Sequence, residues 1–300
     1  MNNTYFELSD DFENIIKNTL NDKEKIVPEA LKNICNFNQF EDKLNDKQII
    51  SIKQNPTGWT NIVYEVETNE GNFFFRFPRD EFWSRTIVKD YEFAKYIYGK
   101  TNFDTVKLEL FYDNDRPFSV HKKIAGIPLA EFMNDLSSDE VKTISNEIAK
   151  FMYQLHCLDF DKSKIFSINN IGLNLTDFLD ELLNVHVDKN DMNFWIPTSI
   201  HSDDICLVHG DLNSSNVLLD ENRHVAAIID FGFGGFGNKY NDIGRIIGRC
   251  PTPFKNEIVN SYEQYSNSKL DSKLLDTNIN TWTDIDNSYI NYMRTIGIYK

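Results

Sequence analysis

The most informative part of the sequence is His209–Asn216, which reads HGDLNSSN and is followed fourteen residues later by DFG at Asp230–Gly232. Three short apolar segments, CLVHG, NVLLD and VAAIID, alternate with polar loops in this region. Their length and their β-branched residues predict buried strands. An aspartate or asparagine beside a strand is often only a turn residue. Three of them at this spacing, between three strands, indicate a polar site built on strand ends.

Asp211, Asn216 and Asp230 have the chemistry that phosphoryl transfer needs from a protein. That reaction requires a carboxylate that orients the attacking hydroxyl and accepts its proton, and ligands that hold magnesium on the phosphates. Magnesium prefers oxygen donors and keeps several waters, so one amide and one carboxylate are enough. We therefore expect Asp211 to act as the base, with Asn216 and Asp230 as the magnesium ligands.

The same residues resemble the signature H-G-D-x-x-x-x-N, followed by a strand ending I-D-F, of the aminoglycoside phosphotransferase and choline kinase superfamily. The matching positions are His209, Gly210, Asp211, Asn216, Ile229 and Asp230. The resemblance implies a protein-kinase-like fold, the roles just given for the base and the metal ligands, and Mg²⁺ as cofactor. It also implies that His209 is a buried brace of the loop and that Asp242 stabilises the catalytic loop.

The order of elements upstream agrees with such a fold. Segments 48–54, 62–68 and 72–78 read as strands, 85–99 as a helix, and 105–112 and 117–124 as two more strands. After residue 126 the pattern becomes mainly helical. We expect an α+β, two-lobed protein-kinase-like fold whose small lobe has a five-stranded antiparallel sheet plus a helix. The expected divisions are a helical extension at 1–46, a nucleotide-binding lobe at 47–121 and a catalytic and substrate-binding lobe at 122–300.

Binding of the nucleotide phosphates is predicted for the first lobe. The loop after residue 54 contains Gly58 and resembles the G-x-x-N and G-x-T-N loops of the superfamily, although a lone glycine in a turn needs no ligand. Arg76 stands where relatives carry a strand lysine, and its fork can clamp phosphate oxygens. It could also be an ordinary exposed strand residue. Family spacing pairs it with Asp90, while Glu92 lies about 200° away around the helix. Both acids remain open as partners.

The segment Ser119–Leu129 resembles the hinge of the superfamily, which ends G-V/I-P-L. By that match, the backbone groups of Lys122 and Ile124 would meet the nucleotide base. Backbone contacts do not distinguish adenine from guanine, so ATP and GTP both remain possible phosphate donors.

The net charge of −15 argues against nucleic acid or an anionic membrane as partner, because both attract clustered lysine and arginine. It suits a cationic small molecule, although excess charge is usually solvated surface. Residues 171–204 hold seven acids and one lysine, a balance of −6, which is either an acidic wall for an aminoglycoside or a solvated helical face. The aromatic residues Trp282, Tyr289, Tyr292, Phe194 and Trp195 could form a cage for a quaternary ammonium or simply belong to the core.

The sequence therefore predicts a nucleotide-dependent kinase of a small molecule, with an aminoglycoside as the favoured acceptor and antibiotic resistance as the role. A kinase of choline, ethanolamine or a sugar is the first alternative. A catalytically silent pseudokinase is the second. The scattered cysteines and the acidic N-terminus, which lacks a long apolar run, favour the cytoplasm.

Overall fold

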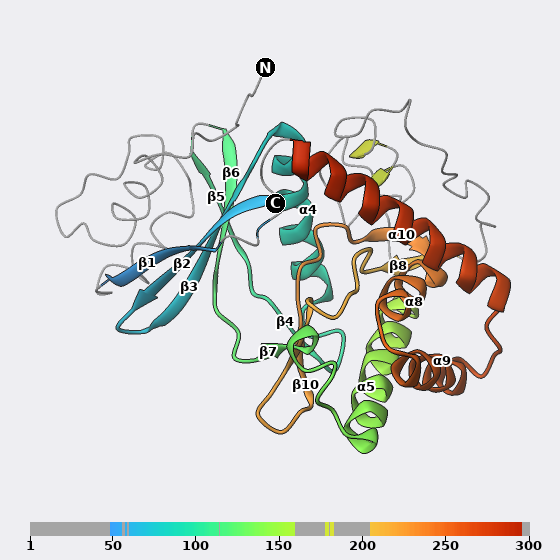
Figure 1. Ribbon diagram of the computed structural model, residues 1–300. Coiled ribbons are helices and arrows are strands. Elements are labelled where there is room, and N and C mark those ends of the chain that lie inside the picture. Colours follow the sequence, from blue (N-terminus) through green and yellow to red (C-terminus); the bar gives the residue numbers. More distant parts are fainter. Residues whose placement is uncertain are drawn as a thin grey trace. The chain divides into compact units, whose positions relative to one another are not determined.

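The computed structural model describes residues 49–55, 58, 60–113, 115–159, 178–179, 181–182 and 205–295 (Figure 1). The expected N-terminal helices and most of the acid-rich segment lie outside these residues. The chain forms two compact units. The first contains the described residues up to Tyr91 together with Lys107–Lys123, and the second contains Glu92–Val106 and the described residues from Ile124 onward. Within the described part, no helix is both long and apolar enough to cross a membrane.

The first unit contains the predicted five-stranded antiparallel sheet, which confirms the α+β fold class. Its strands are β1 (Ile49–Asn55), β2 (Asn61–Thr68), β3 (Gly71–Pro78), β5 (Glu109–Asp113) and β6 (Arg116–Lys122), in the order β1-β2-β3-β6-β5. Stacking of Phe77 on Phe118, with ring centroids 5.1 Å apart, fills one face with apolar surface. The β2–β3 turn uses Gly71 at φ +114°, a conformation that favours glycine.

Helix α4 (Glu81–Ile97) follows β3 and starts four residues before the predicted position. The Asp80 carboxylate accepts the Trp83 N–H at 2.9 Å, which caps this earlier start. The predicted strand over 105–112 is only partly correct. Its first residues belong to β4 (Asp104–Thr105), which pairs in parallel with β10 (Val225–Ile228), while β5 alone joins the five-stranded sheet. A pattern in one segment cannot reveal that its two halves have different partners.

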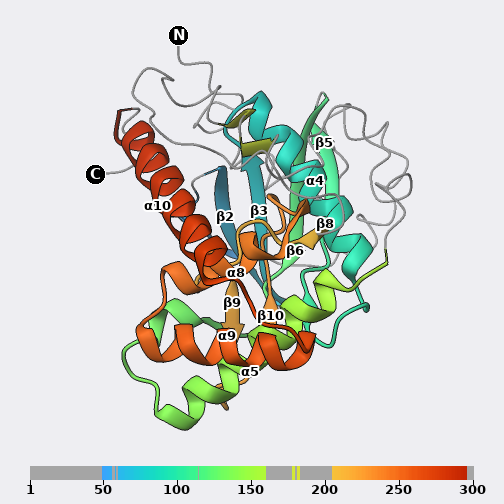
Figure 2. The same cartoon turned by 90° about the vertical axis from the view of Figure 1, so that its right-hand side faces the viewer.

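The second unit is mainly helical, as predicted. Helix α5 (Ser138–His156) begins with a capping box in which Ser137 and Glu140 satisfy each other's backbone N–H groups. It is followed by α8 (Lys239–Gly248), α9 (Thr252–Ser266) and α10 (Ser272–Thr295), and the short 3₁₀ turn η1 (Leu129–Glu131) precedes it. Helices α5 and α9 pack side by side, as Figure 2 shows.

The three predicted short strands are present as β8 (Ile205–Val208), β9 (Val217–Leu219) and β10. Two further strands, β7 (Ile127–Pro128) and β11 (Gly235–Asn238), were not predicted, because proline and glycine are depleted in strands. They complete the sheets β4-β10-β9-β7 and β11-β8. In the antiparallel β9–β10 hairpin, Ile228 pairs with Val217. The residue before β9 and the residues after β10 therefore meet at one end of the hairpin.

Candidate active site

Asn216 and Asp230, the predicted magnesium ligands, lie at this shared end of the β9–β10 hairpin. The Ile229 N–H donates to the Asn216 carbonyl oxygen at 3.0 Å, so the backbone before Asp230 is tied to the backbone of Asn216. Asp230 itself has φ 67°, in the left-handed region that non-glycine residues avoid. Such a conformation costs about 1–3 kcal/mol and is concentrated at functional sites. The hairpin thus fixes where both oxygen donors lie.

Asp211, the predicted base, is joined to Asn216 in the same loop. The Asn216 side-chain amide nitrogen donates to the Asp211 carbonyl oxygen at 2.9 Å, which directs the amide oxygen away from that bond and leaves it to accept a cation. A second amide, from Asn213, donates to the Asp211 carboxylate oxygen Oδ1 at 3.1 Å. Asn213 is buried, and the sequence did not identify it as part of the site.

His209 braces the loop as the family resemblance implied. Its Nε2 contacts the Ile229 carbonyl oxygen at 3.0 Å, and its Nδ1 lies 3.3 Å from the Asp211 backbone nitrogen. Because a carbonyl only accepts, the ring proton lies on Nε2, and Nδ1 accepts the Asp211 N–H. The ring also packs on Phe231, with centroids 4.5 Å apart. His209 is completely buried and connects the loop of the base to the strand that leads to Asp230.

Asp242, in the first turn of α8, binds the backbone of the loop that carries the predicted base. Its two carboxylate oxygens accept the backbone N–H groups of His209 and Gly210, each at 2.8 Å. Gly210 has φ +79°, and a Cβ there would lie 2.2 Å from the Phe233 carbonyl oxygen. Only glycine fits this close approach. The position of Asp242 is the one expected for an acid that stabilises the loop.

A buried histidine and tyrosine extend this bracing to two helices. His156, the last residue of α5, lies 3.2 Å through Nε2 from Asp242 Oδ2 and 2.8 Å through Nδ1 from the Tyr262 hydroxyl of α9. Burial, followed by the charges of Cys206, Cys157 and Asp242, raises the pKa of Tyr262 far above its usual range. The Tyr262 hydroxyl therefore stays protonated and donates a hydrogen bond to His156 Nδ1. The Nε2–H group of His156 in turn donates a hydrogen bond to the Asp242 carboxylate.

Arg245, on α8, contacts the predicted base directly, and the sequence did not suggest it. Its Nε and Nη2 lie 2.7 Å from Asp211 Oδ1, and its Nη1 lies 2.5 Å from Asp286 Oδ2 on α10. The guanidinium also lies over the Trp282 ring, 4.5 Å from its centroid. Burial opposes its charge, but the Asp211 and Asp286 carboxylates more than offset that effect and raise the pKa of Arg245. The available signal was a charged residue on the otherwise apolar face of α8, three positions after Asp242.

These residues suit a magnesium ion that arrives with a nucleotide. The described part of the chain has no group of three or more histidine, cysteine, aspartate or glutamate side chains that could hold a metal. Magnesium at nucleotide sites is usually bound by one or two protein oxygens together with phosphates and water. The Asn216 amide oxygen and the Asp230 carboxylate provide that donor set.

In the first unit, Arg76 of β3 forms an ion pair with Asp90 of α4. The two side chains are 13% and 2% exposed, respectively, so Arg76 is not an ordinary exposed strand residue. Of the two acids that the sequence left open, Asp90 is the one that contacts Arg76. Its neighbour Lys89 is completely buried, and burial lowers the pKa of this lysine to about 7.

Gly58 has a structural requirement of its own. A Cβ at this position would lie 2.3 Å from the Asn61 carbonyl oxygen, and the Gly58 carbonyl accepts the Arg79 guanidinium at 2.9 Å. Lys122 is the last residue of β6, and the Lys123 N–H bonds to β3 through the Asn72 carbonyl at 2.8 Å. Antiparallel alternation then points the backbone groups of Lys122 away from β3. Lys122 lies two residues beyond Val120, the last residue of β6 that pairs with β5. Ile124 is the residue at which the chain enters the second unit.

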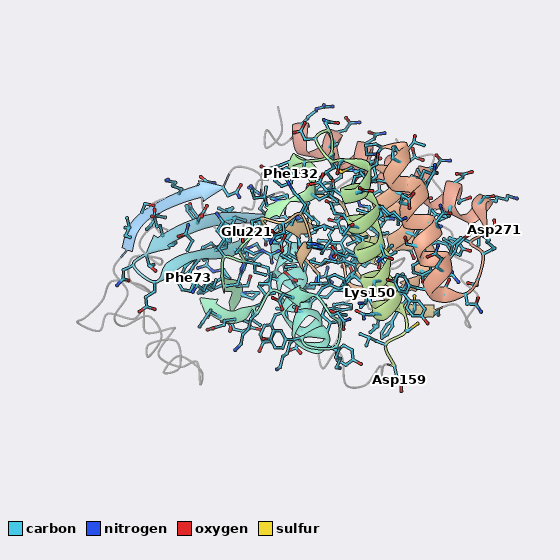
Figure 3. The ribbon with its side chains drawn as sticks, turned by 90° about the horizontal axis from the view of Figure 1, so that it is seen from below. Phe73, Phe132, Lys150, Asp159, Glu221 and Asp271 are labelled. Atoms are coloured by element: carbon cyan, nitrogen blue, oxygen red, sulfur yellow. The ribbon has the colours of Figure 1, made fainter. Side chains whose placement is uncertain are left out.

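The features expected to recognise the acceptor are less fully described. Six of the seven acids in 171–204 lie outside the described residues, together with Lys189, and so do Phe194, Trp195 and the side chain of Tyr292. Glu181 is described and half-buried. Trp282 and Tyr289 are buried, and the Trp282 ring already faces Arg245. These two aromatic side chains therefore belong to the core. Figure 3 labels Lys150 on α5 and Asp271 just before α10.

Comparison with known proteins gives one family and a group of similar structures. Residues 51–272 match the model of the phosphotransferase enzyme family. The GDP and kanamycin complex of APH(2")-IIia is similar, with a TM-score of 0.66 and 19% identity over 87% of this chain and 92% of that one. The streptomycin–ATP–APH(2")-IIa ternary complex has a TM-score of 0.58 and 19% identity over 85% and 90%. Macrolide 2'-phosphotransferase MphH from Brachybacterium faecium has a TM-score of 0.58 and 10% identity over 86% and 92%. At these identities the likeness establishes the fold.

Proposed function

Because the chain belongs to the phosphotransferase enzyme family, we propose that it transfers the γ-phosphate of ATP or GTP to a hydroxyl group of an aminoglycoside antibiotic. The family match spans the HGD, DFG and hinge segments and confirms the superfamily that the sequence resembled. That the chain is a phosphotransferase follows from the family. The acceptor, the metal and the roles of individual residues are the content of the proposal.

The observation that supports it most directly is the arrangement of Asp211, Asn216 and Asp230 around one end of the β9–β10 hairpin. Asp211 orients the acceptor hydroxyl and takes its proton as the oxygen attacks phosphorus. Asn216 and Asp230 hold Mg²⁺, which when bound neutralises the charge of the phosphate oxygens. Without a carboxylate at position 211 the hydroxyl would lack both its hydrogen-bond acceptor and its proton acceptor.

For the phosphate donor, we assign residues 47–121 to nucleotide binding and residues 122–300 to catalysis and acceptor binding. Arg76 binds phosphate oxygens, with Asp90 fixing its guanidinium. The Gly58 loop approaches the phosphates through its backbone, and the backbone groups of Lys122 and Ile124 bind the nucleotide base. The orientation of Lys122 beyond the end of β5 supports that last assignment.

An aminoglycoside is the best-supported acceptor. Similar solved structures include complexes of phosphotransferases with kanamycin, streptomycin and gentamicin. A polycation is also attracted by a chain of net charge −15 with an acid-rich segment at 171–204. The alternative hypothesis of a choline kinase is supported in part by the C-terminal aromatic residues, which could form a cage. The burial of Trp282 and Tyr289 weakens that hypothesis. We infer a role in antibiotic resistance from this acceptor.

A phosphotransfer panel tests the proposal. The purified chain is incubated with ATP or GTP, Mg²⁺ and one acceptor from the set of kanamycin, gentamicin, streptomycin, a macrolide, choline and simple sugars, and the phosphorylated product is identified by mass spectrometry. An aminoglycoside phosphate is the expected product, with binding that weakens as salt screens the charges. Phosphorylation of choline or a sugar, with none of any aminoglycoside, would replace the proposed acceptor and leave the enzyme class unchanged.

A further inference from the structure

The Asp211 carboxylate is held unequally through its two oxygens. Oδ1 accepts Nε and Nη2 of Arg245, both at 2.7 Å, and the Asn213 amide at 3.1 Å. Oδ2, within the described part of the chain, receives only a long contact of 3.5 Å from the Asn216 amide. A carboxylate oxygen that already accepts several N–H groups is a poor proton acceptor, whereas its partner remains available. The arrangement therefore distinguishes the two oxygens of the base.

Arg245 is itself fixed by contacts that leave it little freedom. Its remaining nitrogen, Nη1, donates to Asp286 on α10 at 2.5 Å, and its flat face rests on Trp282. The side chain is 8% exposed, and the side chain of Asp286 is 13% exposed. Asp286 also pairs with Arg249, at the end of α8. All three nitrogens of this planar guanidinium make contacts, and one of its faces packs on an aromatic ring. It can therefore fix a carboxylate in a single orientation, which a lysine cannot do.

We propose that Arg245 is a positioning residue for the phosphoryl-transfer reaction: it fixes Asp211 through Oδ1 so that Oδ2 accepts the proton of the acceptor hydroxyl, and Asp286 on α10 anchors it. The inference rests on the proposed role of Asp211 as base. A misplacement of about 1 Å in a reacting group can lower a rate by about 10²-fold, so the orientation of this carboxylate has a measurable consequence.

The rate to measure is the hydrolysis of ATP and GTP. Water takes the place of the acceptor in this reaction, so the assay does not require the acceptor to be known. Arg245→Gln should lower kcat by about 10- to 100-fold. The KM for nucleotide should stay within about twofold, because Arg245 contacts no residue assigned to the nucleotide. Arg245→Lys should recover part of the loss, and Asp286→Asn should lower kcat by a smaller factor. Arg223→Gln, at an arginine of the β9–β10 turn that lies over the Phe132 ring, is the matched control and should leave kcat unchanged.

A double-mutant cycle separates positioning from a general structural role. In an Asp211→Asn background, Arg245→Gln should produce no further loss of kcat, because Arg245 acts only through that carboxylate. Equal losses in both backgrounds, or an unchanged kcat in Arg245→Gln, would overturn the proposal. Thermal melts establish that each variant is folded, and Arg245→Lys serves where Arg245→Gln does not fold. If Asp211→Asn retains full turnover, the proposed base is wrong; if that variant is inactive and Arg245→Gln is not impaired, only the present inference fails.

Discussion

Asp230, the predicted metal ligand after β10, has a left-handed backbone conformation with φ 67°. Asp230→Ala should abolish turnover and leave the fold intact, because this carboxylate neutralises phosphate charge in the loaded site. Turnover at increasing Mg²⁺ and a thermal melt measure the two effects. Near-normal turnover at saturating magnesium would show that Asp230 is not a metal ligand.

Arg76 combines a buried ion pair with an assigned contact to phosphate. Arg76→Ala should weaken nucleotide binding and slow turnover, and Arg76→Lys should recover part of both, since lysine retains the charge but loses the bidentate fork. Because Arg76→Ala leaves the Asp90 carboxylate buried without this partner, folding is checked by circular dichroism. Equal nucleotide affinity in the wild type and both variants, measured by calorimetry, would remove Arg76 from the site.

The contacts of a site residue were predictable where the residue belongs to a local sequence motif. They were not predictable where the fold brings together residues that are distant in the sequence. Family spacing pointed to Asp90 and left Glu92 open, and the structure pairs Arg76 with Asp90, fourteen residues along the chain. Arg245 lies 34 residues from Asp211, and Asp286 lies 41 residues beyond Arg245. Their meeting depends on how α8 and α10 pack, and no short pattern in the sequence encodes that packing.

Among elements, the join between α8 and the catalytic loop depends on Asp242. Asp242→Asn replaces an acceptor oxygen with a donor opposite the His209 or Gly210 N–H, so one of those groups loses its partner. Hydrogen bonds to a charged group contribute about 1.5–3 kcal/mol each, and the free energy of unfolding should fall by about that amount. Urea denaturation measures the change. Asp284→Asn, at an exposed position of α10, is the control; equal stability of both variants would contradict the bracing role.

A surface pair between α5 and the start of β10 gives stability a pH dependence. His224 Nδ1 lies 2.7 Å from Glu147, and this hydrogen bond, together with the charge of Glu147, raises the pKa of His224 above 6.5. A raised folded-state pKa contributes stability that is complete below the unfolded pKa and is lost as pH rises through the folded value. The side chain is 55% exposed, so the contribution is under about 1 kcal/mol.

His224→Gln isolates this pair, since Glu147 keeps its bond from the Val225 N–H at 2.7 Å. The wild type should unfold at a higher temperature than the variant near about pH 5.5, and the difference should vanish near about pH 8.5, well above the ordinary histidine pKa. A difference that grows with rising pH would contradict the assigned sign.

At the level of elements, the hydrophobic period located the helices, whereas the Asp80 cap of α4 and the long-range strand pairing were missed. The pattern after residue 126 indicated helices, and α5 begins at a capping box of Ser137 and Glu140, which is a local arrangement. Segment 105–112 was read as one strand, yet Thr105 pairs with Ile228 and Glu109 pairs with Val120. Strand preference depends on the partner that a segment finds, and that partner is not adjacent in sequence.

For the whole molecule, net charge is only a partial guide to the acceptor. The chain carries −15, but around the predicted base Asp211 and Asp286 are balanced by Arg245 and Arg249. This cluster is neutral, so the attraction for a cationic acceptor has to come from other acids. The acid-rich segment at 171–204 is the remaining candidate in the sequence, and four of its residues are described.

The overall class was predictable because several kinds of signal agreed: strand–helix order, the HGD and DFG motifs, and the mainly helical pattern after residue 126. The family match over 51–272 and the five-stranded sheet confirm it. The acceptor was not predictable to the same degree, since fold and catalytic motifs are shared by enzymes with different substrates.

The most direct measurement of the central claim compares wild type and Asp211→Asn in transfer of labelled γ-phosphate to kanamycin. Asparagine retains shape and hydrogen bonding but cannot accept the hydroxyl proton. Because a general base contributes about 10²–10⁴-fold, the transfer rate should fall by that factor. Affinity for magnesium nucleotide should change little, since Asn216 and Asp230 remain. An unchanged rate of transfer in Asp211→Asn would contradict the account.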